Sequence, residues 1–328
     1  MLPLLFPFIA DTVIAPPPDY QDIFVNEWGV VVFSSMGTTL AGAPDENGNV
    51  IFGREPFGSL CVDAPVIWLH GAFIDSATLT VKTNQGWLTA LYPEPDFTDA
   101  GERPVTASWD ISAPPPLPLQ QRPEIEVPAG IPFAWAMDFW RQAPGRDLFS
   151  SETGEYMGNF LYYEAGLPFW EPPDGIYDPK ILAGYYSPEG LVITTGAEPS
   201  VGRIQLVPLP DGVGVSPDTE QPLSDEKICE IICGWAGGNL KSQEITALWQ
   251  TWKPFFSVSE VIDSEYPVDV LYNDGLPADR RGSGQQWILF PLPWNVVESI
   301  SSLHLDVHDS AERTITYNRL FLGLIRVY

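Results

Sequence analysis

Basic residues are scarce in this chain: 16 Lys and Arg stand against 43 Asp and Glu, which gives a formal net charge of −27 at pH 7. A surface of this charge repels polyanions such as DNA, so we exclude nucleic acid as a partner. The same field attracts divalent cations and basic partner surfaces, although an acidic balance mainly keeps a protein soluble. Charge alone therefore narrows the partners without naming a function.

Cysteines and long hydrophobic runs are also few. Cys61, Cys229 and Cys233 are too few for a disulfide scaffold, and no further Cys or His pair follows at zinc-ligand spacing, so we expect free thiols. The apolar segment Leu2–Ala10 is too short to cross a bilayer, which predicts no transmembrane segment. Because the sequence around Ala15 suits a signal peptidase, residues 1–22 are either an ordered arm or a residual export signal.

Catalytic and cofactor signatures are missing from the sequence. There is no Gly-x-Ser-x-Gly elbow, no Gly-Lys-Ser/Thr phosphate loop and no Gly-x-Gly-x-x-Gly turn, so these hydrolase and nucleotide chemistries have no support. The paired carboxylates of glycosidases are defined by their separation in space, so Glu124, Glu126 and Glu164 qualify by residue type alone. We assign no catalytic residue and no cofactor, and leave open whether the protein is an enzyme.

What the sequence does contain is typical of β structure. Its 34 prolines and 28 glycines fall between short runs of β-branched and aromatic residues, as in a chain of many strands separated by turns. We predict an all-β fold of mainly antiparallel, sandwich-like sheets, with a hairpin turn at Asn84-Gln85-Gly86. The expected strands are Phe24–Phe33, Val66–His70, Thr78–Thr83, Leu88–Tyr92, Phe160–Tyr163, Leu191–Thr195, Arg203–Val207, Trp287–Phe290, Leu303–Val307 and Leu320–Val327.

One region carries helical punctuation. Ser224 caps a run with apolar residues at helical spacing that Gly237 and Gly238 end, and Ser242 caps a second such run that stops at Pro254. The pattern predicts an αα-hairpin inserted at residues 224–254, with its apolar faces packed on a sheet. We expect the two cysteines of the first helix to be reduced and buried there.

A proline-rich segment divides the chain in sequence. Pro114-Pro115-Pro116-Leu117-Pro118 removes backbone donors and favours an extended form, so it cannot be a central strand. We expect a crossing segment between two β layers here. The predicted units are residues 23–128, ending in this segment, and residues 129–328, containing the helical hairpin. A single β domain remains an open alternative at this length.

Five short segments have distinctive patterns: Asn26–Val31 (Asn-Glu-Trp-Gly-Val-Val), Ala64–His70, Gly86–Pro93, Phe160–Gly166 and Glu244–Phe256. Together they resemble an uncharacterised group of exported bacterial proteins with a His-Glu-Trp-Gly-Thr-Phe signature near the N-terminus. In this chain Asn26 and Val30 replace the His and Thr of that signature, and Glu164 stands at a basic position. The resemblance implies a β-rich protein of the cell exterior or envelope and brings no activity with it.

One triplet has the pattern of a metal site. His304, Asp306 and His308 alternate with the apolar residues of the expected strand Leu303–Val307, so they share one face of it. Two imidazoles and a carboxylate are suitable ligands for a divalent transition metal. The alternative is a strand whose polar face meets solvent.

Tryptophans suggest a second type of site. Trp135, Trp140 and Trp170 lie in a proline- and aromatic-rich part of the chain, and exposed rings there would form a platform for a sugar or a protein partner. Core packing is the alternative for each ring. We therefore expect a non-enzymatic extracellular binding or structural protein, with a polysaccharide or protein as partner. The alternative is a hydrolase, with or without a metal, that acts on extracellular polymer.

Overall fold

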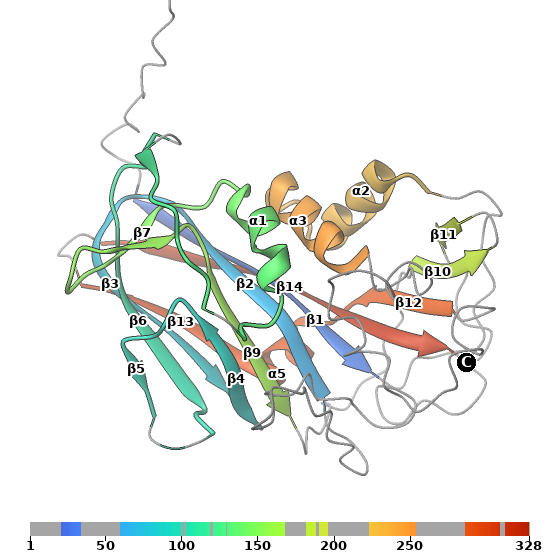
Figure 1. Cartoon of the computed structure of the whole chain (residues 1–328), viewed down its shortest axis with the longest axis horizontal. Coiled ribbons are helices and arrows are strands. Elements are labelled where there is room, and N and C mark those ends of the chain that lie inside the picture. Colours follow the sequence, from blue (N-terminus) through green and yellow to red (C-terminus); the bar gives the residue numbers. More distant parts are fainter. Residues whose placement is uncertain are drawn as a thin grey trace, which may run out of the picture.

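The structure, a computed structural model, consists of two packed β-sheets with a layer of helices on one outer face (Figure 1). It describes residues 21–33, 60–99, 101, 103–118, 121–128, 130–167, 182–187, 190–195, 223–253, 286–308 and 312–327. The predicted all-β, sandwich-like fold with a short helical hairpin is confirmed. The segment Leu2–Ala10, the expected strand Arg203–Val207 and Trp170 lie outside the described residues.

The larger sheet has eight strands in the order β11-β10-β12-β14-β1-β2-β9-β4. Its members are β1 (Asp22–Phe33), β2 (Leu60–Gly71), β4 (Trp87–Tyr92), β9 (Leu161–Leu167), β10 (Leu182–Ser187), β11 (Gly190–Thr195), β12 (Gln286–Pro291) and β14 (Thr314–Val327). Strands β1 and β14 pair in parallel, whereas the other pairs are antiparallel. The first and last described strands of the chain therefore lie side by side in the middle of the sheet.

The smaller sheet has six strands, five of them in the order β13-β3-β6-β7-β8, with β5 paired to β6. They are β3 (Ile74–Thr83), β5 (Phe97–Thr98), β6 (Thr106–Ala113), β7 (Leu148–Ser150), β8 (Tyr156–Gly158) and β13 (Ser301–Val307). Each sheet contains strands from both sides of residue 128. The expected boundary there does not separate two β units, because β13 returns to pair with β3 and β14 returns to pair with β1.

The turn at Asn84-Gln85-Gly86 connects β3 to β4, but these strands belong to different sheets. The predicted hairpin is therefore wrong: the chain turns a corner of the sandwich instead of folding back on itself. A side chain at Gly86 would collide with the carbonyl oxygen of Gly166, since its Cβ would lie 1.9 Å from that atom. Turn chemistry was recognised from the sequence, whereas the sheet that receives the next strand was not.

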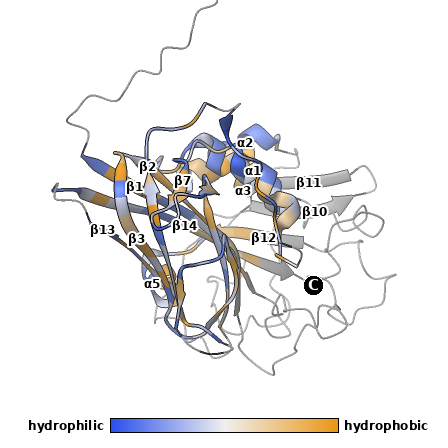
Figure 2. Ribbon diagram, turned by 60° about the vertical axis from the view of Figure 1, so that its left-hand side comes forward, coloured by the Kyte–Doolittle hydropathy of each residue, from blue (hydrophilic) through white to orange (hydrophobic). Residues whose placement is uncertain are grey.

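Two hydrophobic cores lie on opposite faces of the larger sheet. Alternation along β1 sends Ile23 and Val25 toward the smaller sheet and Trp28 and Val30 toward the helices. The helix-side core is rich in indole rings: the ring centroids of Trp28 and Trp68 are 5.9 Å apart. Helices α2 and α3 carry both hydrophilic and hydrophobic residues (Figure 2), and their apolar faces complete this core.

The helical layer consists of α1 (Met137–Arg141), preceded by a 3₁₀ turn (Ala134–Ala136), and the hairpin of α2 (Asp225–Trp235) and α3 (Ser242–Trp252). The hairpin is confirmed, although Lys241 and not Ser242 is the N-cap of α3. A further short helix, α5 (Trp294–Ile300), was not predicted. No helix among the described residues is long and apolar enough to cross a membrane.

The predictions for the two cysteines of α2 and for the proline-rich segment are confirmed in part. Cys229 and Cys233 are free thiols, as expected, but they are half-buried, and burial raises the pKa of Cys229. The proline-rich segment leaves the smaller sheet after β6 and reaches the helix side of the larger one, where Ile125 and Val127 pack against the core. It is therefore a crossing segment between layers.

Candidate functional site

The helix-side core ends in a row of polar residues near one end of the larger sheet. Asn26 lies two positions before Trp28, and His70 lies two positions after Trp68, so strand alternation places both polar residues on the helix-facing side. The register sets Asn26 opposite both Trp68 and Asn318. Three strands that are distant in sequence thus bring their polar side chains together.

Helix α3 covers this row with a buried acid, Glu244. One Glu244 oxygen accepts a hydrogen bond from Asn26 Nδ2 at 2.9 Å, and the other lies 2.5 Å from His70 Nε2. The same carboxylate accepts the backbone N–H of Lys241 at 2.7 Å, which caps the helix. Asn318 Nδ2 donates to Asn26 Oδ1 at 2.9 Å, so the network joins the helix to β1, β2 and β14.

A pocket of about 660 Å³ opens beside this network. This volume lies within the range of small-molecule sites in proteins. Its described lining comes from the sheet, the proline-rich segment and the loops before β7 and α3: Phe24, Asn26, His70, Gly71, Pro116, Arg122, Pro144, Gly145, Arg146, Gly238, Asn239, Lys241, Thr316 and Asn318.

The charge of the lining differs from that of the whole chain. Among the described lining residues there are three cationic side chains, Arg122, Arg146 and Lys241, and no Asp or Glu. Other groups fix both guanidinium groups: Arg122 Nε lies 2.9 Å from a buried carboxylate oxygen of Asp147, and Arg146 donates to the carbonyl oxygen of Gly71. Arg122 is thus paired with an acid behind the lining, whereas Arg146 and Lys241 bring positive charge to the pocket of a strongly negative protein.

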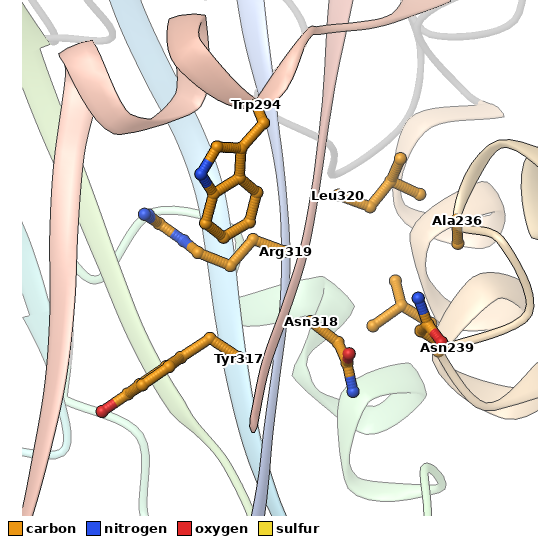
Figure 3. A pocket seen from close by; sticks show the side chains of 8 residues that line it. Ala236, Asn239, Trp294, Tyr317, Asn318, Arg319 and Leu320 are labelled. Atoms are coloured by element: carbon orange, nitrogen blue, oxygen red, sulfur yellow. The ribbon is translucent and has the colours of Figure 1, made fainter. Parts of the chain in front are cut away.

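A second, smaller pocket of about 140 Å³ adjoins the first and shares Asn239 and Asn318 with it. It lies where β12 stops pairing with β14, because that ladder begins only at Leu322. Figure 3 shows Trp294, Tyr317 and Arg319 on one side of β14, and Asn318 and Leu320 on the other. The small pocket therefore passes around the edge of the strand.

The other face of β1 carries a separate buried network around Glu27. Arg319, opposite Glu27 in the parallel ladder, donates to it, and Tyr163 donates to Glu27 Oε1 at 2.7 Å. Burial and the nearby Glu27 charge raise the pKa of Tyr163 well above its usual value. Burial alone would lower the pKa of Arg319, but Glu27 reverses this effect and raises it. Tyr163 and Arg319 also hydrogen-bond the hydroxyl of Ser301 on β13, so these groups cross-link the two sheets, and they do not line the larger pocket.

The predicted metal triplet lies elsewhere. His304, Asp306 and His308 are all exposed on the outer face of the smaller sheet, as strand alternation predicts. His308 Nε2 lies 3.9 Å from Asp306 and 3.3 Å from the Thr78 hydroxyl. Within the described part of the chain no group of three or more His, Cys, Asp and Glu side chains is arranged to hold a metal ion. The triplet stays a prediction.

The predicted aromatic platform needs a correction. Trp140 is 0% exposed and donates its indole N–H to Thr251 Oγ1 at 2.9 Å, so it belongs to the core under α3. Trp135 is half-buried against Phe133 and Phe139. Since α1 turns Trp140 inward, the two rings do not form a common exposed surface.

The glycosidase-type acids are not brought together either. Glu164 is buried on β9 and accepts a hydrogen bond from Tyr162 at 2.5 Å. Glu124 and Glu126 are exposed in the proline-rich segment. None of the three lines the larger pocket.

The residues of the pocket escaped sequence analysis because they are far apart in the chain. A usable signal was the polar character of Asn26 and Asn318 two positions before the apolar helix-facing residues Trp28 and Leu320. The segments that carry the sequence resemblance lie in the adjacent strands β1, β2, β9 and β4 and in α3. Three of them supply Asn26, His70 and Glu244.

Comparisons with known proteins give no match: no family model, no curated protein and no solved structure resembles this chain significantly.

Proposed function

We propose that this protein is a non-enzymatic binding protein that holds the anionic group of a small ligand in the larger pocket. The observation that carries the proposal is the composition of the lining, which has three of the chain's 16 Lys and Arg and, in its described part, none of the 43 acids. A protein of charge −27 gains nothing in solubility from such a cluster. Asp147 already pairs with Arg122, and a bound anion would pair with Arg146 and Lys241.

The construction of the pocket supports recognition of a carboxylate or phosphate. Arg122 and Arg146 are held by Asp147 and Gly71, so little side-chain entropy is lost when they bind a ligand. Guanidinium groups pair with carboxylates and phosphates in a bidentate geometry, and the exposed Lys241 adds an ammonium to the lining. The amides of Asn239 and Asn318 provide neutral donors and acceptors beside these charges.

Titration calorimetry with galacturonate, galactose and inorganic phosphate tests this function. We expect the two anions to bind and neutral galactose to bind far more weakly. Lys241→Gln should weaken anion binding about tenfold, which corresponds to about 1.4 kcal/mol. Lys227→Gln is the matched control, because Lys227 is an exposed lysine of the same hairpin, paired with Glu230 and outside the pocket. Equal affinity for galactose and galacturonate would reject the function.

We also propose that the protein acts outside the cytoplasm, on the basis of the sequence around Ala15, which suits a signal peptidase, and of the sequence resemblance. Expression with the natural N-terminus in a bacterium, followed by fractionation, tests this location. We expect the chain in the periplasm or medium with its first residues removed. An uncleaved chain found only in the cytosol would contradict it.

A hydrolase acting on extracellular polymer is the second candidate, and the His70–Glu244 pair favours it. A buried carboxylate that orients an imidazole is a common arrangement for general acid–base catalysis. His70 also lines the pocket. Release of reducing ends from acidic polysaccharide by the wild type, lost in His70→Gln, would favour the enzyme, and an effect of EDTA would indicate a metal. No turnover would leave the binding function.

A further inference from the structure

We propose that the ligand is an acidic saccharide whose carboxylate occupies the larger pocket while a neighbouring sugar ring packs against Trp294. This inference rests on the proposed function and names its ligand class. Three observations support it: the two pockets adjoin each other, their linings carry amides and a hydroxyl, and one indole ring is exposed.

The two pockets adjoin each other. Asn239, just before α3, and Asn318, on β14, line both pockets, so the pocket with the cationic groups adjoins the smaller pocket beside β14. The smaller pocket contains Trp294 in its lining (Figure 3). A ligand longer than one ring can therefore extend from the cations to this indole.

The polar residues of the two linings suit sugar hydroxyls. Asn239 and Asn318 have side-chain amides, which both donate and accept hydrogen bonds, and Thr316 adds a hydroxyl. Sugar hydroxyls also donate and accept, so this lining matches them. No described Asp or Glu lines either pocket, and the nearby acids Asp147 and Glu244 are already paired with Arg122 and His70.

Trp294 presents an exposed indole ring in the smaller pocket. Its side chain is 52% exposed, and apart from Phe97 it is the only large hydrophobic residue that the described structure leaves exposed. An exposed indole presents a rigid apolar face that can bury the C–H face of a sugar ring. Its neighbours in the lining are held in place: the Tyr317 hydroxyl accepts the backbone N–H of Leu305 at 2.8 Å, and Arg319 is buried beside Glu27.

Calorimetry with galacturonic acid, its trimer and a neutral galactose trimer tests the inference. We expect the acidic trimer to bind about tenfold more tightly than the monomer and the neutral trimer to bind far more weakly. Trp294→Ala should remove the advantage of the trimer and leave monomer affinity unchanged. Trp294 is the first residue of α5 and Ala is a better helix former, so the variant should fold, which circular dichroism verifies.

Phe97→Ala is the matched control, because Phe97 is equally exposed but lies in the smaller sheet. The saccharide inference is overturned, and the anion site stands, if the trimer binds no more tightly than galacturonate. The same holds if Trp294→Ala binds the monomer and the trimer as tightly as the wild type does. If phosphate binds in a Lys241-dependent manner but no uronate does, the result is the same. If no anion binds, the proposed function itself fails.

Discussion

His70 Nε2 and Glu244 Oε1 lie 2.5 Å apart in the layer between the larger sheet and α3, although the two residues are 174 positions apart in the chain. The Glu244 side chain is fully buried and that of His70 is 10% exposed. The pair therefore fastens the helical hairpin to the end of β2, at the wall of the larger pocket. Local stability and the shape of the site depend on the same contact.

Replacing Glu244 by Ala should lower the free energy of unfolding by about 3–5 kcal/mol, because it leaves His70, the Asn26 amide and the Lys241 N–H without their shared acceptor. Urea denaturation measures the change. Gln250→Ala, at an exposed position of the same helix, is the control and should stay within about 0.5 kcal/mol of the wild type. Equal midpoints for both variants would show that the network contributes nothing.

A second prediction concerns Glu27 and Arg319 between the sheets. Arg319→Met should destabilise the fold by about 3–5 kcal/mol, because the buried carboxylate of Glu27 loses its counter-charge. The double variant Glu27→Leu/Arg319→Met should regain much of this loss, since no unpaired charge remains. Denaturation of the two single variants and the double variant forms the cycle. Strictly additive losses would contradict the coupling.

The elements of the fold followed from local patterns, and their partners did not. The alternation of Leu303–Val307 and the capping by Ser224 predict a strand and a helix that the structure contains. The turn at Asn84-Gln85-Gly86 has hairpin chemistry but joins two sheets, because long-range packing decides that β3 pairs with β6 and β4 with β9. The same holds for the parallel pairing of β1 with β14, whose residues are separated by nearly the whole chain.

A third prediction concerns alkaline pH. Burial and the neighbouring Asp147 raise the pKa of Tyr156 to about 12, whereas the unfolded value is near 10. The folded phenol thus keeps its proton where the unfolded one loses it, so its stabilising contribution is complete below about pH 10 and is lost as the pH rises through about 12. Urea midpoints should fall more steeply over this range in the wild type than in Tyr156→Phe. Parallel slopes would contradict the shift.

The candidate site was the least accessible part to sequence analysis. Arg122, Arg146 and Lys241 lie in loops or at a helix end, where no periodicity constrains them, and they meet only because three layers of the fold converge. At Trp140, by contrast, a binding residue was predicted where the structure has a core residue. Composition suggested an exposed ring, but the short helix α1 turns it into the core. Exposure of a tryptophan depends on tertiary packing, which spacing along the chain does not encode.

The last prediction concerns the exposed face of His304, Asp306 and His308, where an added divalent metal is the ligand to test. If this face binds zinc or nickel, the ion should raise the unfolding temperature of the wild type, because a ligand that binds only the folded state stabilises it. His308→Ala should abolish this rise and leave the metal-free protein nearly unchanged, since its side chain is exposed and contacts only Ser76, Thr78 and, at 3.9 Å, Asp306 among the described partners. Glu126→Gln, at an exposed acid of the proline-rich segment on the helix side of the larger sheet, controls for general cation binding to an acidic surface and should retain the rise. Calorimetric melting curves of the three proteins with and without metal decide the question. If the wild type melts at the same temperature in both conditions, the triplet is the solvent-facing side of β13 and nothing more.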